Sequence, residues 1–119
     1  MQHMSIDVPE STAGRLELMI ATSTLERMRG LLGRAALGAR EGMLLPKCAM
    51  IHTFGMGYPI DVVYLDRRNR VLKVSPALRP RRMDGHWRAY TVLELAAGTA
   101  QACGIRPGCA LALPGGSGR

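Results

Sequence analysis

Two runs of β-prone residues stand at the centre of this chain, Ile60-Asp61-Val62-Val63-Tyr64-Leu65 and Val71-Leu72-Lys73-Val74. The polar segment Asp66-Arg67-Arg68-Asn69-Arg70 separates them, which is typical of a β-hairpin. Because strand side chains alternate, the even-numbered residues of the first run would share one face of a sheet and the odd-numbered ones the other. Each set contains apolar residues, so we expect both faces of this hairpin to be covered.

Further β-prone runs between turn residues lie on both sides of the hairpin. They span residues 16–21, 42–46, 50–54, 90–95 and 109–113. The Arg- and Pro-rich segment 76–88 predicts a loop. The regular strand–helix alternation of a parallel sheet is missing from the sequence. The pattern therefore predicts a mainly β, β-rich α+β fold: a single compact antiparallel sandwich or barrel with one or two short helices.

The longer predicted helix spans residues 25–32. Thr22-Ser23-Thr24 offers a side-chain cap, and Glu26 lies near the positive end of the helix dipole. One helical face would carry Leu25, Met28, Leu31 and Leu32. We expect the last three of these side chains to pack on the sheet, and Gly33 to end the helix. A second helical segment of one or two turns is predicted at residues 98–103.

The chain has 119 residues, which suits one small domain. Residues 15–113 would form it, with flexible ends at 1–14 and 114–119. No apolar run approaches the roughly 18 residues needed to span a bilayer. The first residues lack the apolar core of a secretory signal, so we expect a cytoplasmic protein; the alternative is an exported protein whose signal peptide was omitted from this chain. The three cysteines are an odd number and include no CxxC pair, which argues against both a disulfide framework and a zinc ribbon.

The chain is strongly basic. Sixteen Lys and Arg against nine Asp and Glu give a formal net charge of +7, which favours anionic partners. The candidate anion-binding residues are Arg67, Arg68, Arg70, Arg79, Arg81 and Arg82. With Trp87 they provide cations and a stacking surface for single-stranded nucleic acid. Because aromatic residues make up only 4% and no nucleic-acid-binding motif is present, solvated loops are the favoured interpretation.

Five short motifs follow one another along the chain. They are RGLLGR at 29–34, EGMLLP at 41–46, HTFGMGYPIDVVYLD at 52–66, VLELAAGTA at 92–100 and GIRPG at 104–108. In this combination, over residues 15–113, the sequence resembles the bacterial and archaeal family called domain of unknown function 192 (DUF192). The resemblance implies a compact β-rich domain and assigns it no biochemical role. Gly55, Gly57 and Cys109 depart from the pattern of that family.

Residues with chemical potential gather near the centre of the chain. The candidate pocket residues are His52, Thr53, Phe54, Met56 and Asp61. With Cys48, the imidazole and the carboxylate would suit zinc or a Cys/His enzyme. The sequence offers no obvious fourth metal ligand and no residue at a recognisable spacing to orient the imidazole. Structural roles are therefore favoured: His52 and Thr53 would hold the loop, and Asp61 would bind backbone amides.

The favoured function is a non-catalytic binding or interaction module with no metal site and no cofactor. Its partner would be a small molecule or a protein, and the chain itself would be a monomer or a weak oligomer. One alternative is a metal-dependent or Cys/His enzyme centred on Cys48, His52 and Asp61. The second alternative is a nucleic-acid binder that uses the Arg-rich loops.

Overall fold

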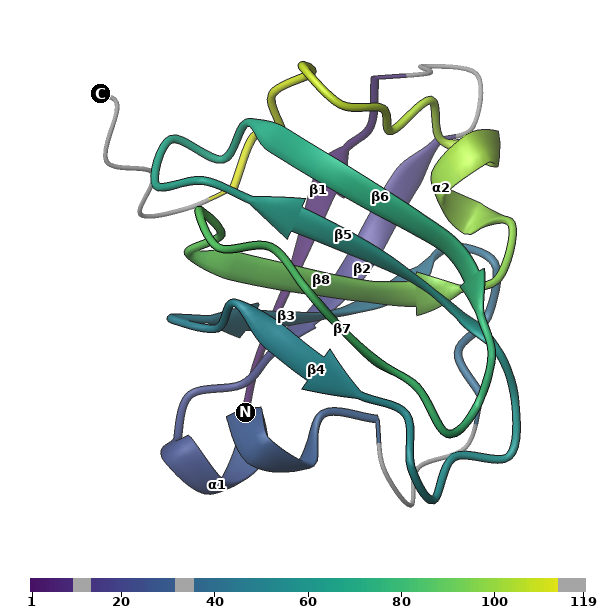
Figure 1. Ribbon diagram of the computed structural model, residues 1–119. Helices are drawn as coiled ribbons and strands as arrows, with labels where there is room; N and C mark the ends of the chain where they lie inside the picture. Colours follow the sequence, from purple (N-terminus) through teal and green to yellow (C-terminus); the bar gives the residue numbers. More distant parts are fainter. Residues whose placement is uncertain (10–13, 32–35, 114–119) are drawn as a thin grey trace.

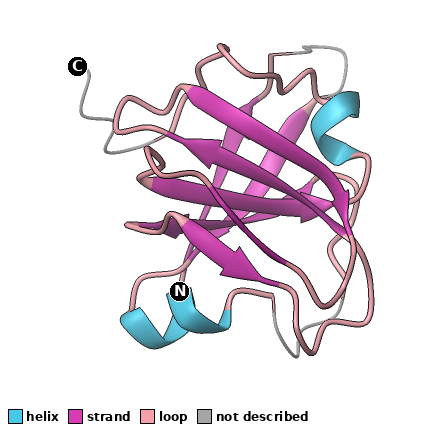
Figure 2. Cartoon of the chain, viewed as in Figure 1, coloured by secondary structure: helices cyan, strands magenta, loops and turns pink. Residues whose placement is uncertain are grey.

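The computed structural model describes residues 1–9, 14–31 and 36–113 of the chain. Strands dominate these residues, and two short helices accompany them (Figures 1 and 2). In chain order the elements are β1 (Gln2–Asp7), β2 (Arg15–Ile20), α1 (Thr24–Arg29), β3 (Glu41–Pro46), β4 (Met50–His52), β5 (Ile60–Leu65), β6 (Val71–Leu78), β7 (Met83–Gly85), β8 (Thr91–Ala96) and α2 (Thr99–Ala102).

The strands form two sheets. The larger sheet has six strands in the order β1-β2-β3-β8-β5-β6, and β4 pairs with β7 in a separate two-stranded sheet. All pairs are antiparallel except β2 and β3, which α1 connects and which run parallel. The larger sheet curls, so that β1 and β2 lie behind β5 and β6 in Figure 1. The predicted β-rich fold with short helices is confirmed, and the parallel pair makes the sheet a mixed one.

Apolar side chains form two cores on opposite faces of the larger sheet. The first core lies inside the curl and joins β1, β2 and α2 to the centre of the sheet. The second lies on the other face, where the β4–β7 sheet and the loop after β4 cover it. Val63 and Leu65 enter the first core, whereas Ile60, Val62 and Tyr64 enter the second, and all five are fully buried. The predicted alternation along β5, with both faces covered, is confirmed.

Three segments differ from the sequence prediction. The sequence predicts a flexible end at residues 1–14, but β1 (Gln2–Asp7) pairs with β2 along its whole length. Ile6 anchors this strand, because its side chain is buried in the first core. Residues 109–113 make only one isolated bridge, from Ala110 to Arg70, and no strand. The predicted loop 76–88 contains the end of β6 and the whole of β7.

The helix α1 is shorter than predicted. Its predicted cap is confirmed, because Ser23 Oγ accepts a hydrogen bond from the N–H of Glu26. It ends at Arg29, since Gly30 adopts φ +52° and its N–H closes the last turn on Glu26 O. The predicted packing of Met28 is wrong: this side chain is 72% exposed, whereas Leu31, just beyond the helix, is buried. Leu32 lies outside the described residues. No helix in the described part of the chain is long and apolar enough to cross a membrane.

Candidate functional site

A groove runs between α1 and β4 and encloses about 440 Å³. Both elements lie in the lower half of Figure 1, with β4 in front of the larger sheet and α1 beneath it. The lining residues come from α1 and its C-cap, from the end of β3 and the turn after it, from β4, and from β8: Thr24, Arg27, Met28, Arg29, Gly30, Leu45, Lys47, Cys48, Met50, Ile51, His52 and Glu94. We call this cavity the α1–β4 groove.

Glu94 supplies a buried carboxyl group to the α1–β4 groove. It lies on β8, between Met43 of β3 and Val62 of β5, and is only 3% exposed. Burial raises the pKa of Glu94 to about 7, although a hydrogen bond from the backbone of Leu31 opposes the rise. Its Oε1 atom has no hydrogen-bond partner among the described residues. The groove therefore contains a carboxyl group that changes charge near neutral pH and has an unused acceptor.

The backbone approaches this carboxyl group closely at Gly30. A Cβ atom at this position would lie 2.9 Å from Glu94 Oε1 and 3.4 Å from Oε2. The positive φ of Gly30 also belongs to a region that side-chain-bearing residues rarely adopt. Glycine therefore allows the end of α1 to close over Glu94.

Cys48 lies on the same groove but is not an activated nucleophile. Burial raises the pKa of its thiol, and the negative charge of Glu94 adds to the rise, while a hydrogen bond from the backbone of Met50 to the sulfur and the charge of Arg27 oppose it. Its Sγ donates a hydrogen bond to Met50 O at 3.2 Å. A thiol with a raised pKa is protonated at neutral pH and is a weak nucleophile.

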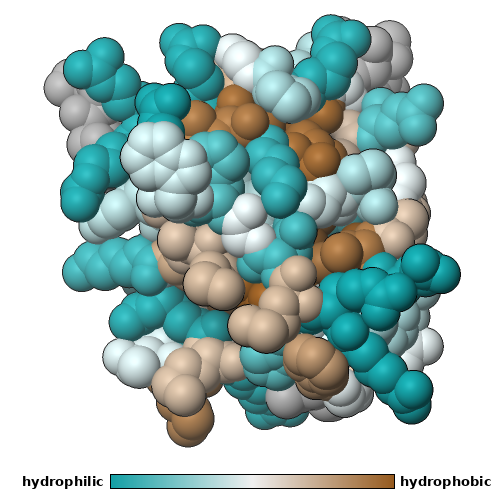
Figure 3. All heavy atoms as spheres, in the orientation of Figure 1, coloured by the Kyte–Doolittle hydropathy of each residue, from teal (hydrophilic) through white to brown (hydrophobic). Residues whose placement is uncertain are grey.

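The mouth of the groove is both cationic and apolar. Arg27 and Lys47 provide positive charge, whereas Met28 and Met50 are 72% and 59% exposed. Apolar residues gather over α1, β4 and β7 in Figure 3. Leu25 of α1 and Met83 of β7 are exposed as well. Exposed methionines of this kind are typical of adaptable binding surfaces.

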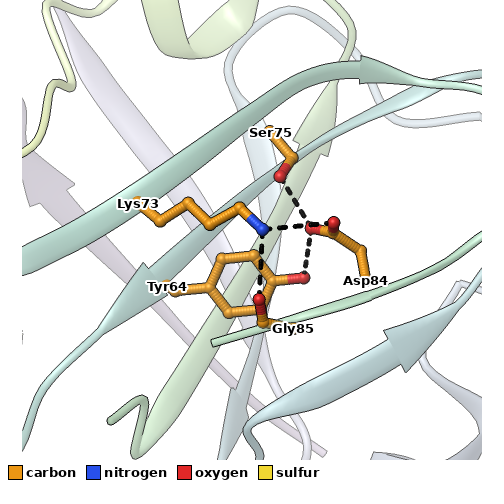
Figure 4. Close-up of polar contacts among 5 residues, drawn as sticks. All are labelled: Tyr64, Lys73, Ser75, Asp84 and Gly85. Atoms are coloured by element: carbon orange, nitrogen blue, oxygen red, sulfur yellow. Dashed lines mark hydrogen bonds and ion pairs between the residues drawn. The ribbon is translucent and has the colours of Figure 1, made fainter. Parts of the chain in front are cut away.

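The two-stranded sheet that carries one wall of the groove is fixed to the larger sheet by Asp84 of β7. Oδ2 of Asp84 accepts hydrogen bonds from Tyr64 and Ser75, at 2.7 and 2.6 Å, and its Oδ1 accepts one from Lys73 at 3.2 Å (Figure 4). Lys73 also donates to Gly85 O. This cluster positions β7 and, through the β4–β7 ladder, β4.

Among the sequence-predicted pocket residues, His52 is the one that belongs to the described lining of the α1–β4 groove. The ring of His52 lies 5.9 Å from that of Phe54, which is exposed. Thr53 is buried, and its hydroxyl donates to Arg79 O and accepts from Arg82 N–H. Met56 belongs to the second core.

Asp61 lies apart from this groove and has a structural role. Its carboxylate accepts hydrogen bonds from the N–H groups of Ala77, Gly98 and Ala100, at 2.8, 3.0 and 3.0 Å. The prediction that Asp61 binds backbone amides is confirmed. Cys48 and His52 share the groove without Asp61. No group of three or more His, Cys, Asp or Glu side chains in the described ranges is placed to hold a metal ion.

The candidate anion-binding arginines fall into two groups at opposite ends of the β5–β6 hairpin. Arg67, Arg68 and Arg70 lie in the turn between these strands, and Arg79, Arg81 and Arg82 lie beyond the other end of β6. Arg67 stacks on the ring of Tyr90, and Arg70 donates to Gly108 O. Because β6 has eight residues, it separates the two groups by roughly 25 Å, so they do not form one patch.

Glu94 and Asp84 are not among the residues that the sequence predicts for a site. The available signal for Glu94 was a single charged residue in an otherwise apolar strand, with Leu93 and Leu95 beside it. Asp84 lies in a segment without strand periodicity, so nothing near it in the sequence indicates a partner on β5 or β6.

Comparisons with solved structures support the fold. A protein of unknown function from Novosphingobium aromaticivorans DSM 12444 is similar with a TM-score of 0.79 and 25% identity, covering 95% of this chain and 86% of that one. A protein from Sinorhizobium meliloti 1021, proposed to be a transcription regulator, is similar with a TM-score of 0.77 and 21% identity, covering 90% of this chain and 88% of that one.

Comparison with curated proteins found no match. The comparison with protein families found DUF192, described as an uncharacterized ACR, over residues 6–113, which is nearly the whole chain. The earlier resemblance is thereby confirmed. This chain belongs to the DUF192 family.

Proposed function

We propose that this protein is a non-catalytic binding module whose ligand enters the α1–β4 groove and presents a positively charged N–H donor to Glu94. The observation that carries this proposal is the buried Oε1 of Glu94, which has no hydrogen-bond partner in the described parts of the chain. A buried polar atom without a partner costs roughly 1–3 kcal/mol. A ligand that donates a hydrogen bond there recovers this energy, and a cationic donor also matches the ionised carboxylate.

The other residues that line the groove indicate the chemistry of the rest of the ligand. Leu45 and Ile51 give the groove apolar walls, and Arg27 and Lys47 bring positive charge to its mouth. A primary amine on an apolar spacer fits the inner part, and an anionic group fits the mouth. Small-molecule and peptide sites commonly combine apolar walls with a few polar groups in this way.

Two contacts support binding over catalysis. The thiol of Cys48 hydrogen-bonds to the carbonyl of Met50, and the ring of His52 contacts Phe54. Nucleophilic catalysis instead needs the base within hydrogen-bond reach of the nucleophile. The Cys/His alternative is therefore less supported than a binding site at Glu94.

A defined probe tests this proposal. n-Butylammonium carries a primary ammonium ion on a short apolar chain, and 1-butanol is a neutral control of the same length. Methyl NMR signals of Met28 and Met50 would report occupation of the groove. At about pH 8, where Glu94 is largely ionised, we expect saturable shifts with the ammonium ion and much weaker ones with the alcohol.

Two variants make the test specific. Glu94→Gln keeps the shape of the side chain and removes its charge, so the shifts with n-butylammonium should be lost. Glu17→Gln removes one charge from the exposed face of β2, outside this groove, and should leave them unchanged. Equal binding of n-butylammonium by the parent protein and by Glu94→Gln contradicts the proposal.

A further inference from the structure

The strand β4 presents its outer edge to the α1–β4 groove. On the inner edge, His86 N–H donates to Ala49 O at 3.0 Å, and Thr53 N–H donates to Arg82 O at 2.8 Å. Main-chain groups of an antiparallel strand alternate between its two edges. The N–H and C=O groups of Met50 and His52, which lie between Ala49 and Thr53, therefore point away from β7 and toward the groove.

This outer edge has almost no hydrogen-bond partners. The Cys48 thiol is a weak donor to Met50 O. The backbone of Met50 also makes a weak hydrogen bond to the sulfur of Cys48. Within the described ranges, no backbone–backbone hydrogen bond outside the β4–β7 ladder involves Met50 or His52. An unpaired strand edge is a template for a strand from another chain.

We propose that the ligand of the α1–β4 groove is an extended, acidic peptide segment that adds a strand to β4 and inserts one lysine side chain to meet Glu94. This inference rests on the proposed function, because it assigns a partner to the same groove. In such a strand alternate side chains point to the same side, so one of them faces the bottom of the groove. A lysine has an apolar stem for Leu45 and Ile51 and an ammonium group for Glu94 Oε1.

The charge and apolarity of the surroundings specify the rest of the segment. The chain carries a net charge of +7, and Arg27 and Lys47 stand at the mouth of the groove. Acidic residues on either side of the inserted lysine would complement these cations. Met28 on α1 and Met50 on β4 are exposed, and Figure 3 shows apolar atoms continuing over this face. Their flexible side chains suit apolar residues of the added strand.

The test begins with selection of random nonapeptides on the whole 119-residue chain. Selected sequences are synthesised with acetylated N-termini, so that a lysine is the only primary amine offered to Glu94. We expect a shared pattern of one lysine between acidic residues. Replacement of that lysine by norleucine, or Glu94→Gln in the protein, should weaken binding by about tenfold or more, as expected for a hydrogen bond to a charged group. Glu17→Gln should bind the peptides as the parent does.

Amide hydrogen exchange tests the strand addition itself. Peptide binding should slow exchange of the His52 N–H, which points toward the groove, while the Thr53 N–H is already bonded to Arg82 O. Selected peptides that bind without protecting His52 overturn the added strand. Protection of His52 that grows with protein concentration in the absence of peptide assigns the edge to a second copy of this chain and also overturns the inference.

The n-butylammonium and peptide experiments together separate the peptide partner from the proposed amine site. If n-butylammonium binds in a Glu94-dependent manner but no selected peptide requires Glu94, the groove takes a small amine and the peptide partner is wrong. If neither probe depends on Glu94, both proposals are wrong.

Discussion

The hydroxyl of Tyr64 donates a 2.7 Å hydrogen bond to Oδ2 of Asp84, and this contact joins the larger sheet to the β4–β7 sheet (Figure 4). Tyr64 is fully buried in the second core, and Asp84 pairs with Ile51 of β4. One wall of the α1–β4 groove is therefore held in place by a polar contact beneath it. Loss of this contact should affect both the stability of the protein and the order of the groove.

Removal of the Asp84 carboxylate is expected to destabilise the fold. Asp84→Ala leaves the buried hydroxyl of Tyr64 without this acceptor and should lower the free energy of unfolding by roughly 2–3 kcal/mol. Tyr64→Phe removes one hydrogen bond without leaving a buried hydroxyl and should cost about 1 kcal/mol. Urea denaturation of both variants provides the measurement. Unchanged midpoints would show that this cluster does not hold the two sheets together.

The same cluster predicts a loss of stability in acid. Burial alone would raise the pKa of Asp84, but hydrogen bonds from Ser75, Tyr64 and Lys73 hold it below its usual value of 3.8. A carboxylate with a lowered pKa stabilises the folded state above its ordinary pKa, and this contribution disappears as pH falls through the lowered value. Above the ordinary pKa of Asp84, the parent protein should therefore be more stable than Asp84→Asn. The difference between their urea midpoints should disappear as the pH falls through the lowered pKa of Asp84.

Glu94 should have the opposite effect on stability. Its pKa is about 7, raised from 4.5 chiefly by burial, so the folded protein binds a proton more tightly than the unfolded chain does. Stability should fall as pH rises between about 4.5 and 7 and then level off. Glu94→Gln removes this cost and should be more stable than the parent above pH 7 by up to about 3 kcal/mol. The free energy of unfolding of parent and variant is measured by urea denaturation at about pH 4.5 and above pH 7. The same dependence of stability on pH in both proteins would contradict this prediction.

Much of this fold could be predicted from local patterns, but the groove could not. The alternation along β5 follows from residues close together in the sequence. The acceptor role of Asp61 was predicted as well, but its three partners, the N–H groups of Ala77, Gly98 and Ala100, are distant in the chain. Glu94 acquires its role only because Gly30, distant in the chain, closes over its carboxyl group. Spacing alone also placed Met28 on a packed helical face, yet α1 ends at Arg29 and leaves that side chain exposed.

Ligand binding should depend on the protonation of Glu94. The affinity for n-butylammonium should rise with pH up to about 7 and then remain constant, since the cation binds the ionised carboxylate. By the same linkage, the bound cation should lower the pKa of Glu94. NMR titrations at several pH values give both quantities, and 1-butanol should show much less dependence on pH. An affinity for the ammonium ion that is constant across this range would place the cation away from Glu94.

The side chains around α1 offer a test of which of them are core. Leu31 is 2% exposed in the second core, whereas Met28 is 72% exposed at the groove. Leu31→Ala should lower the free energy of unfolding by about 2–4 kcal/mol through lost burial and a cavity. Met28→Ala should change it by less than about 0.5 kcal/mol, as is usual for surface positions. Similar urea midpoints for the two variants would contradict this placement of α1.

Gly30 should be intolerant of any side chain, and Gly57 provides the matched control. At Gly30 a Cβ atom would lie 2.9 Å from Glu94 Oε1 and would also require φ +52°, so Gly30→Ala should cost roughly 1–3 kcal/mol. An added Cβ at Gly57 meets nothing within 4 Å, so Gly57→Ala should be close to neutral. Displacement of the chain at Gly30 should also weaken the Glu94-dependent binding of n-butylammonium. If Gly30→Ala matched Gly57→Ala in both urea midpoint and ammonium binding, the close approach of Gly30 to Glu94 would have no part in forming the groove.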